Sequence, residues 1–537
     1  MKVKPLFCIF IALAGLLACH TDRSSKKKVF SYNESSNIAS LDPAFAKNQS
    51  IIWAVHQIYN TLVETDSQLN MVPSLARRWE VSDDRMRYTF FLRQDVFFHD
   101  NDAFEKGRGR RMTAHDVVYS FKRITDVRIA SSGAWIFNSR VNAETGFTAL
   151  NDSVFQLQLL QPFTPVLGLL SMQYCSIVPY EVVDKYRQDF RSHPCGTGPF
   201  VFKSWEEGQA MVLLKNEHYF EYDSSGIRLP YIDAIKISLY TSKATEFLLF
   251  RQGRLDFIND IDASFKDEVL TKTGILKKEW ESKVVLSKHP YLNTEYLGIL
   301  LSDHSAGNPL QNKRIRLAIN YGFDRRKLIM YLRNSIGTPA ESGFIPAGLP
   351  SFDSVLVRGY QYDPVKARKL LKDAGFENGI GLPPIKLLTI AIYSELAGFI
   401  AKELEQIGII VEVEVVQKSL LLAQTAKSQA PFFRASWIAD YPDAENYLSV
   451  FYSKNPAPPN YTRYHNEAFD KLYDSALTIT DDSSRYVVYR KMDRMILEDA
   501  PIVPLWYDEV IRLVQPRVSG FHPNGLNLLE LRYVHLN

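Results

Sequence analysis

The segment from residue 385 to 416 restricts the folds open to this chain more than any other stretch. Its two ends, Ile385 to Ile392 and Ile409 to Val416, are rich in β-branched and aliphatic residues and predict two strands. Between them, Leu396 to Ile407 has the apolar spacing of a helix. A strand, a helix and a second strand in this order favour a parallel sheet with a right-handed crossover. The same alternation recurs along the chain, so the sequence predicts a mixed α/β protein.

The length of the chain predicts more than one domain. At 537 residues it is far longer than a single hydrophobic core usually supports, so we expect two or three domains. The chain shows no internal repeat. We therefore expect a large protein with several lobes.

The N-terminus carries an export signal. A basic start precedes the apolar run Leu6 to Leu17, which is shorter than the roughly 20 residues that a membrane-spanning helix needs. Such a run is typical of a secretory signal peptide. It ends in Leu16-Leu17-Ala18-Cys19, which resembles the bacterial lipobox, in which the cysteine receives a diacylglycerol. We predict a lipoprotein signal peptide over 1–18, lipidation of Cys19 and a linker over 19–28. The alternative is an ordinary signal peptide with a chance cysteine.

The charge balance gives no reason to expect a nucleic-acid partner. The formal net charge is +3, and the only basic block outside the signal is Lys26 to Lys28. No later segment contains 18 consecutive apolar residues, so we expect no second membrane segment.

Cysteine usage fits an exported protein. Of the 4 cysteines, Cys8 lies in the signal peptide and Cys19 is the predicted lipid acceptor, which leaves Cys175 and Cys195. In an oxidising compartment these two could form a disulfide, worth roughly 3 kcal/mol for a loop of about 20 residues. Two buried free thiols are the alternative. The spacing is not that of a zinc site.

Signatures of catalysis and metal binding are absent from the sequence. There is no GxSxG, HExxH or Walker motif, and the 11 histidines are scattered singly. We therefore predict no enzymatic activity, no metal and no cofactor. Aromatic residues make up 12% of the chain, which is typical of a receptor whose rings line a groove, although core filling is the alternative for most of them.

Several separate segments match one known family in the same order along the chain. The segments are Ser40 to Pro43, Pro73 to Ala76 with Trp79, Tyr88 to Phe90 with Leu92-Arg93, Met112 to Phe121, Gly196 to Phe200, Arg314 to Tyr321 with Asp324-Arg325, Ala367 to Phe376, Ala439 to Pro442 and Ala500 to Leu505. From Val29 onward the chain resembles the extracellular solute-binding proteins of family 5, the dipeptide and oligopeptide receptors of ABC importers.

This resemblance implies a two-lobed, periplasmic-binding-protein-like clamp of class II, with an extra domain on the N-terminal lobe. Two chain crossings, near residues 293 and 506, would form the hinge between the lobes. The implied boundaries are 29–58, 197–293 and 507–537 for lobe I, 59–196 for its extra domain, and 294–506 for lobe II.

The resemblance also places the ligand chemistry in Arg434 to Asp440. It implies that Asp440 accepts the α-ammonium of a peptide, that Arg434 is available to its carboxylate and that Trp437 lines a side-chain pocket. The alternatives are a turn aspartate, a salt-bridged arginine and a core tryptophan. Ser436-Trp437 departs from the Gly-Trp of the oligopeptide receptors, and residues 126–137 match poorly, so no site residue is taken from them.

These features together predict a lipid-anchored substrate-binding protein of an ABC transporter. It would capture short peptides by hinge closure and deliver them to permease subunits. A family 5 receptor for a nickel chelate or an oligosaccharide is the alternative, and an exported hydrolase is a further one. We expect a monomer in the cell envelope, held at the membrane by its N-terminal lipid, on the periplasmic or extracellular face.

Overall fold

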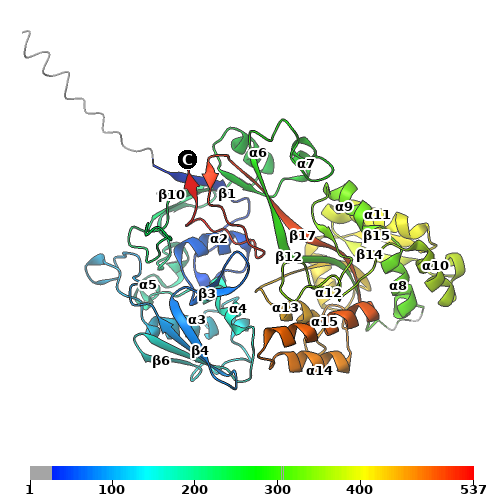
Figure 1. Ribbon diagram of the computed structural model, residues 1–537, viewed down its shortest axis with the longest axis horizontal. Coiled ribbons are helices and arrows are strands. Elements are labelled where there is room, and N and C mark those ends of the chain that lie inside the picture. Colours follow the sequence, from blue (N-terminus) through cyan, green and yellow to red (C-terminus); the bar gives the residue numbers. More distant parts are fainter. Residues whose placement is uncertain (1–26, 304, 306) are drawn as a thin grey trace, which may run out of the picture.

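The structure is a computed structural model that describes residues 27–303, 305 and 307–537. The predicted signal peptide and Cys19 lie outside the described residues. Two lobes lie side by side in Figure 1, lobe I on the left and lobe II on the right. Lobe I holds the N-terminal half of the chain and its last residues, and lobe II holds most of the C-terminal half. The predicted two-lobed α/β fold is confirmed.

The strands of both lobes are short except for two. Their bounds are β1 (Val29–Asn33), β2 (Val63–Thr65), β3 (Met71–Pro73), β4 (Ala76–Val81), β5 (Arg87–Leu92), β6 (Phe147–Asn151), β7 (Val154–Gln158), β8 (Phe200–Glu206), β9 (Ala210–Lys215), β10 (Ala234–Ser238), β11 (Phe257–Asn259), β12 (Val285–Ile299), β13 (Thr338–Pro339), β14 (Ile385–Thr389), β15 (Val411–Val415), β16 (Phe432–Ile438), β17 (Ile502–Val514), β18 (Val518–Ser519) and β19 (His535–Leu536).

The α-helices pack around these strands. Their bounds are α2 (Gln49–Ile58), α3 (Ala114–Thr125), α4 (Val166–Leu170), α5 (Tyr180–Tyr186), α6 (Lys243–Arg251), α7 (Ala263–Val269), α8 (Lys313–Tyr321), α9 (Arg325–Arg333), α10 (Pro364–Asp373), α11 (Ser394–Glu405), α12 (Lys418–Ala426), α13 (Glu445–Leu448), α14 (Glu467–Ala476) and α15 (Asp482–Asp499).

One large sheet runs through both lobes in the order β15-β14-β16-β12-β17-β11-β1-β10-β9-β8. In lobe II, β14 pairs in parallel with β15 across α11, as the strand–helix–strand pattern predicts. In lobe I, β1 pairs in parallel with β10 and β11, so the first strand lies inside the sheet. The sheet therefore joins the two lobes without a break in its strand order.

The long strands β12 and β17 form the connection between the lobes. They pair antiparallel over Val285–Pro290 with Glu509–Val514, and again over Thr294–Gly298 with Ile502–Tyr507. The pairing is irregular between Pro290 and Thr294, where a proline cannot donate to the ladder. One half of each strand thus belongs to each lobe, and the ladder is weakest between the halves.

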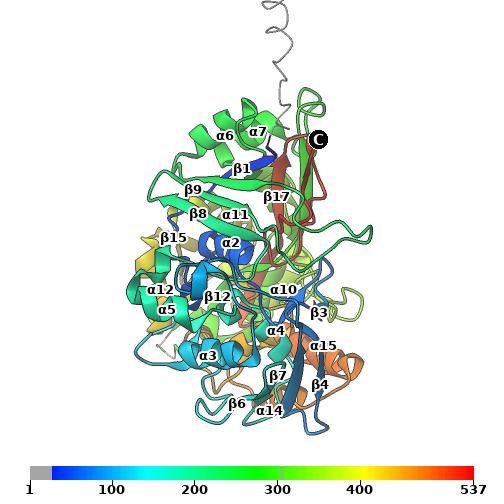
Figure 2. The same ribbon diagram turned by 90° about the vertical axis from the view of Figure 1, so that its left-hand side faces the viewer.

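Lobe I also contains a separate four-stranded antiparallel sheet, β4-β5-β7-β6, covered by α3. Figure 2, which faces this lobe, shows that sheet below β1, β8 and β9. Helix α2 lies between the two sheets in this view. It begins because the side chain of Asn48 accepts a hydrogen bond from the amide of Ile51 at 3.2 Å, and its apolar face is buried.

Two elements differ from the sequence predictions. The sequence of residues 295–301 predicts a strand there, but the strand observed, β12, begins ten residues earlier, because the polar stretch Lys288 to Pro290 still pairs with β17. The sequence also predicts two separate strands, over 502–507 and 509–513, but these residues form one continuous strand, β17. Both differences arise where the chain passes from one lobe to the other.

The disulfide considered from the sequence is not formed. Cys175 and Cys195 are free and buried, and their thiols donate to different carbonyls, those of Leu169 at 3.5 Å and His99 at 3.3 Å. Burial raises the pKa of both thiols. The alternative of two buried free thiols is the one observed, because each sulfur faces its own neighbours.

Among the described residues, no helix is both long and apolar enough to cross a membrane.

Candidate functional site

A cavity of about 460 Å³ lies between the lobes. Its wall in lobe I is formed by the start of α2, by Ser171 to Tyr174 and by the C-terminal segment. Its wall in lobe II is formed by β12 and the end of β16. The lining residues are Ala46, Lys47, Asn48, Gln49, Ile52, Trp53, Thr65, Ser171, Met172, Gln173, Tyr174, Tyr291, Ile438, Ala439, Asp440, Leu526, Asn527 and Leu528.

The lobes also touch at a point away from β12 and β17. The hydroxyl of Thr164, in lobe I, donates to the carbonyls of Leu477 and Ile479, in lobe II, at 3.2 and 3.3 Å. This contact helps to enclose the space between the lobes.

Asp440 lines the cavity from lobe II. It follows the end of β16, which pairs antiparallel with β12 and carries the chain to the cavity. Asp440 forms no ion pair with any described residue, and its Oδ2 accepts one long hydrogen bond, from Nδ2 of Asn446 at 3.4 Å. The protein around it raises its pKa by desolvation, although the side chain keeps access to solvent. A carboxylate in this position can accept a cation from outside the described chain.

Asn446 connects Asp440 to Trp437. Its Oδ1 accepts hydrogen bonds from Nε1 of Trp437 at 2.9 Å and from the backbone amide of Asp440 at 3.3 Å. Asn446 is buried in α13, so its amide is a fixed support for both residues. Sequence reasoning missed this role, because Asn446 resembles any polar residue at the start of a helix.

Arg434 is held within lobe II. Its Nη2 lies 2.7 and 2.6 Å from the two carboxylate oxygens of Glu295, and its guanidinium stacks over the ring of Tyr393 at 3.8 Å. Burial raises the pKa of Glu295, and Arg434 partly offsets the shift. Arg434 does not line the cavity at Asp440. The sequence left a surface or interlobe salt bridge as the alternative for this residue; the salt bridge observed lies within lobe II and is largely buried. The contact of Arg434 with a ligand carboxylate stays a prediction.

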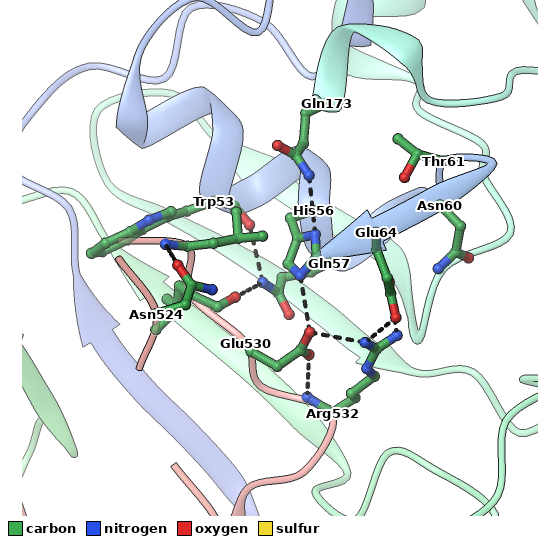
Figure 3. A network of polar contacts seen from close by, with 12 residues as sticks. Trp53, His56, Gln57, Asn60, Thr61, Glu64, Gln173, Asn524, Glu530 and Arg532 are labelled. Carbon is green, nitrogen blue, oxygen red and sulfur yellow. Dashed lines mark hydrogen bonds and ion pairs between the residues drawn. The ribbon is translucent and has the colours of Figure 1, made fainter. Parts of the chain in front are cut away.

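A second cavity, of about 310 Å³, lies beside the first in lobe I. The two cavities share Thr65, Ser171, Gln173 and Leu528 as lining residues. Charged side chains concentrate on the second cavity, and Figure 3 shows them around Arg532. We define the Arg532 network as His56, Glu64, Glu530 and Arg532, which line this cavity, together with Glu221, which pairs with Arg532 but does not line the cavity.

Arg532 makes ion pairs with three carboxylates. Its guanidinium lies 2.6 Å from Glu64, 3.0 Å from Glu221 and 3.2 Å from Glu530. His56 lies 3.2 Å from Glu530 through Nε2, and the side chain of Gln173 contacts its Nδ1 at 3.3 Å. These residues come from α2, β2, the segment before β10 and the C-terminal segment, so no sequence pattern indicated them.

The network separates the pKa values of two of its glutamates. Burial opposes a charge on Glu530, but Arg532 and His56 outweigh it and lower its pKa to about 2. Burial raises the pKa of Glu221 to about 7, which Arg532 offsets only in part. Glu530 is favoured as an anion because His56 adds to the effect of Arg532, whereas the neighbouring Glu64 and Glu530 oppose a charge on Glu221.

The fold and its cavity define a class of protein. Two α/β lobes joined by continuous strands, with a cavity between them, are the architecture of a bacterial binding protein that holds a ligand between its lobes. The sequence profile of the "Bacterial extracellular solute-binding proteins, family 5 Middle" matches residues 70–459. The chain belongs to this family, as its sequence resemblance indicated.

Individual relatives agree with this membership over nearly the whole chain. The protein is 26% identical to "Heme-binding protein A" of Haemophilus influenzae, over 97% of both chains. It is 26% identical to the "Periplasmic oligopeptide-binding protein OppA" of Salmonella typhimurium, over 95% of this chain and 92% of the relative. The structure of the binding protein DppA from Helicobacter pylori, in complex with the peptide STSA, superposes with a TM-score of 0.76 at 26% identity, over 95% of this chain and 98% of that one.

The family settles two of the predictions made from the sequence. The protein is a solute-binding protein of the type that serves ABC transporters and not an enzyme, and it acts outside the cytoplasmic membrane, in the periplasm or at the cell surface. Its relatives include proteins named for heme, oligopeptides and glutathione.

Proposed function

We propose that this protein captures short peptides between its lobes and delivers them to the permease of an ABC importer, while a lipid on Cys19 holds it at the membrane. OppA, by its name, binds oligopeptides, and the DppA structure contains a peptide. The lipobox-like sequence before Cys19 supports the anchor. The boundaries proposed for the lobes and the extra domain are those implied by the sequence.

Asp440 is the observation that carries the peptide proposal. It is a carboxylate without an ion-pair partner among the described residues, it lines a cavity between two lobes, and its amide support holds it in place. The α-ammonium of a free peptide supplies the missing charge and several hydrogen-bond donors. A neutral sugar would leave this carboxylate without a counter-charge.

Closure of the lobes would complete the capture. The irregular pairing between Pro290 and Thr294 gives β12 and β17 a place to bend. A ligand that contacts both walls of the cavity favours the closed form in proportion to those contacts. Asp440 supplies the lobe II contact, and α2 faces it from lobe I.

The test is the substitution Asp440→Asn, studied by calorimetric titration with trialanine and with N-acetyl-trialanine. Loss of a charge-assisted hydrogen bond should weaken trialanine binding by about 10-fold to 100-fold. The acetylated peptide should bind weakly to both proteins. Asp83→Asn makes the same chemical change at an exposed turn and should leave the affinity unchanged.

The opposite result would be equal binding of trialanine by the wild type and Asp440→Asn. Native mass spectrometry of the purified protein gives a second readout. A retained nickel chelate or oligosaccharide in place of a peptide would overturn the proposal.

A further inference from the structure

The Arg532 network contains more carboxylates than guanidinium groups. Three carboxylates, those of Glu64, Glu221 and Glu530, lie within 3.2 Å of the single guanidinium of Arg532. All four side chains are less than one-fifth exposed. Burying an ion pair is costly unless every charge is matched, and an unmatched buried carboxylate costs more.

One buried acceptor beside the network has no donor among the described residues. Gln57 is fully buried and donates to the carbonyls of Trp53 at 3.1 Å and Leu529 at 2.7 Å, but its Oε1 accepts no hydrogen bond from any described residue. Figure 3 shows this amide beside His56 and Glu530. The network therefore has a place for a group that brings both positive charge and donors.

The cavity beside the network is large enough for such a group. Its volume is about 310 Å³, and Glu64 and Glu530 lie in its wall with the polar side chains of Asn60, Thr61 and Ser176. No set of three or more described His, Cys, Asp or Glu residues converges well enough to hold a metal ion. An organic cation is the occupant that this lining favours, because it needs only one or two carboxylates and some neutral acceptors.

The position of this cavity indicates how the cation arrives. It shares Gln173 and Leu528 with the cavity at Asp440, so one ligand can reach both. We propose that the cavity beside the Arg532 network is a subsite for the cationic side chain, of lysine or arginine, of a peptide whose α-ammonium is bound by Asp440. This inference rests on the proposed function and adds to it a preference for basic peptides.

The test compares tripeptides that differ only in one charge. Lys-Ala-Ala and Ala-Lys-Ala are titrated against their norleucine counterparts and against trialanine, with the wild type and with Glu64→Gln. The wild type should bind one of the lysine peptides about tenfold or more tightly than its norleucine counterpart. Glu64→Gln should reduce this ratio to below about threefold, while trialanine binding stays unchanged.

Two further variants make the result decisive. Glu217→Gln makes the same chemical change at an exposed residue of lobe I and should keep the wild-type ratio. If Glu64→Gln does not fold, as judged by thermal melting, Val72→Phe narrows the cavity without altering a charge. It should weaken the binding of the lysine peptide and leave that of trialanine unchanged.

Failure of the inference and failure of the proposed function give different results. If trialanine binding depends on Asp440 but lysine gives no advantage, or if the advantage survives in Glu64→Gln, the subsite is overturned and peptide capture stands. If trialanine does not bind, or binds equally well to Asp440→Asn, peptide capture itself is overturned.

Discussion

Two arginines, a buried one in lobe I and a half-buried one in lobe II, are surrounded by different numbers of carboxylates. In lobe II, Arg434 pairs with Glu295 alone, and its guanidinium also stacks on an aromatic ring. In lobe I, Arg532 pairs with three glutamates. The guanidinium of Arg434 thus has one carboxylate partner among the described residues, whereas that of Arg532 has three and lies beside a cavity. The difference teaches that an ion-paired arginine does not by itself indicate a ligand site. An arginine that has several carboxylate partners and lies beside a cavity is the better candidate, and it is the one on which the proposed subsite rests.

Removal of the two arginines should affect stability unequally, and this is the largest effect we expect. Arg532→Met leaves three partly buried carboxylates without a cation and should lower the free energy of unfolding by about 3–5 kcal/mol. Arg434→Met leaves one such carboxylate, Glu295, and should cost less. Denaturant unfolding of both variants measures the difference. Equal losses would show that the charge imbalance around Arg532 has no energetic consequence.

Glu221 and Glu530 should give pH dependences of opposite sign. The pKa of Glu221 rises from 4.5 to about 7 on folding, so the folded state binds the extra proton between these values. Its stabilising effect is therefore lost as the pH rises through that window, by about 3 kcal/mol or less. The pKa of Glu530 falls to about 2, so its stabilising effect is lost as the pH falls from 4.5 towards 2.

The free energy of unfolding, measured from pH 3 to pH 8, checks both signs. Glu221→Gln should flatten the curve between pH 5 and 8, and Glu530→Gln should flatten it below pH 4.5. Subtraction of the pH curve of each variant from that of the wild type removes the contribution of other groups. One such group is Asp493, whose pKa is also raised by burial, to about 7. A steeper curve for Glu221→Gln between pH 5 and 8 would contradict a raised pKa for Glu221.

Asp440 differs from the carboxylates around Arg434 and Arg532 because it has no ion-pair partner among the described residues. Removal of Asn446, which supports it, should have the smallest of the effects predicted here. Asn446→Ala removes the acceptor for Trp437 and for the amide of Asp440. Looser placement of the carboxylate should weaken tripeptide binding by about 3-fold to 10-fold, which is about 1 kcal/mol. Calorimetric titration measures the change. An unaltered affinity would show that Asp440 is positioned without Asn446.

Local elements of the fold could be predicted from the sequence because their signals are local. The apolar spacing of 385–416 correctly predicted β14, α11 and β15. The first half of β12 was missed, since Lys288 to Pro290 has the composition of a turn and becomes a strand only by pairing with β17. Long-range pairing decided the structure there, and no local pattern reports it.

The candidate site was predictable only in part, for the same physical reason. Asp440, which lines the cavity, was singled out because it belongs to a short segment that resembles a known family, whereas the pocket role predicted for Trp437 in the same segment stays a prediction. The Arg532 network was not singled out, because its members are distant in sequence: His56 and Glu530 are 474 residues apart. Arg434 shows a different limit of the sequence. The segment 434–440 singled out this residue by its resemblance to a family, but the sequence could not reveal that Arg434 pairs with Glu295.

The return of the chain to lobe I has a consequence for the order of folding. The last residues supply Glu530 and Arg532 to side chains that lie near the beginning of the chain. Closing so long a loop is slow in comparison with forming local structure. Lobe I can therefore reach its final packing only after lobe II has been synthesised and the C-terminus has arrived. A chain cut short within its last ten residues would lose the interactions that join its two ends, however complete lobe II was.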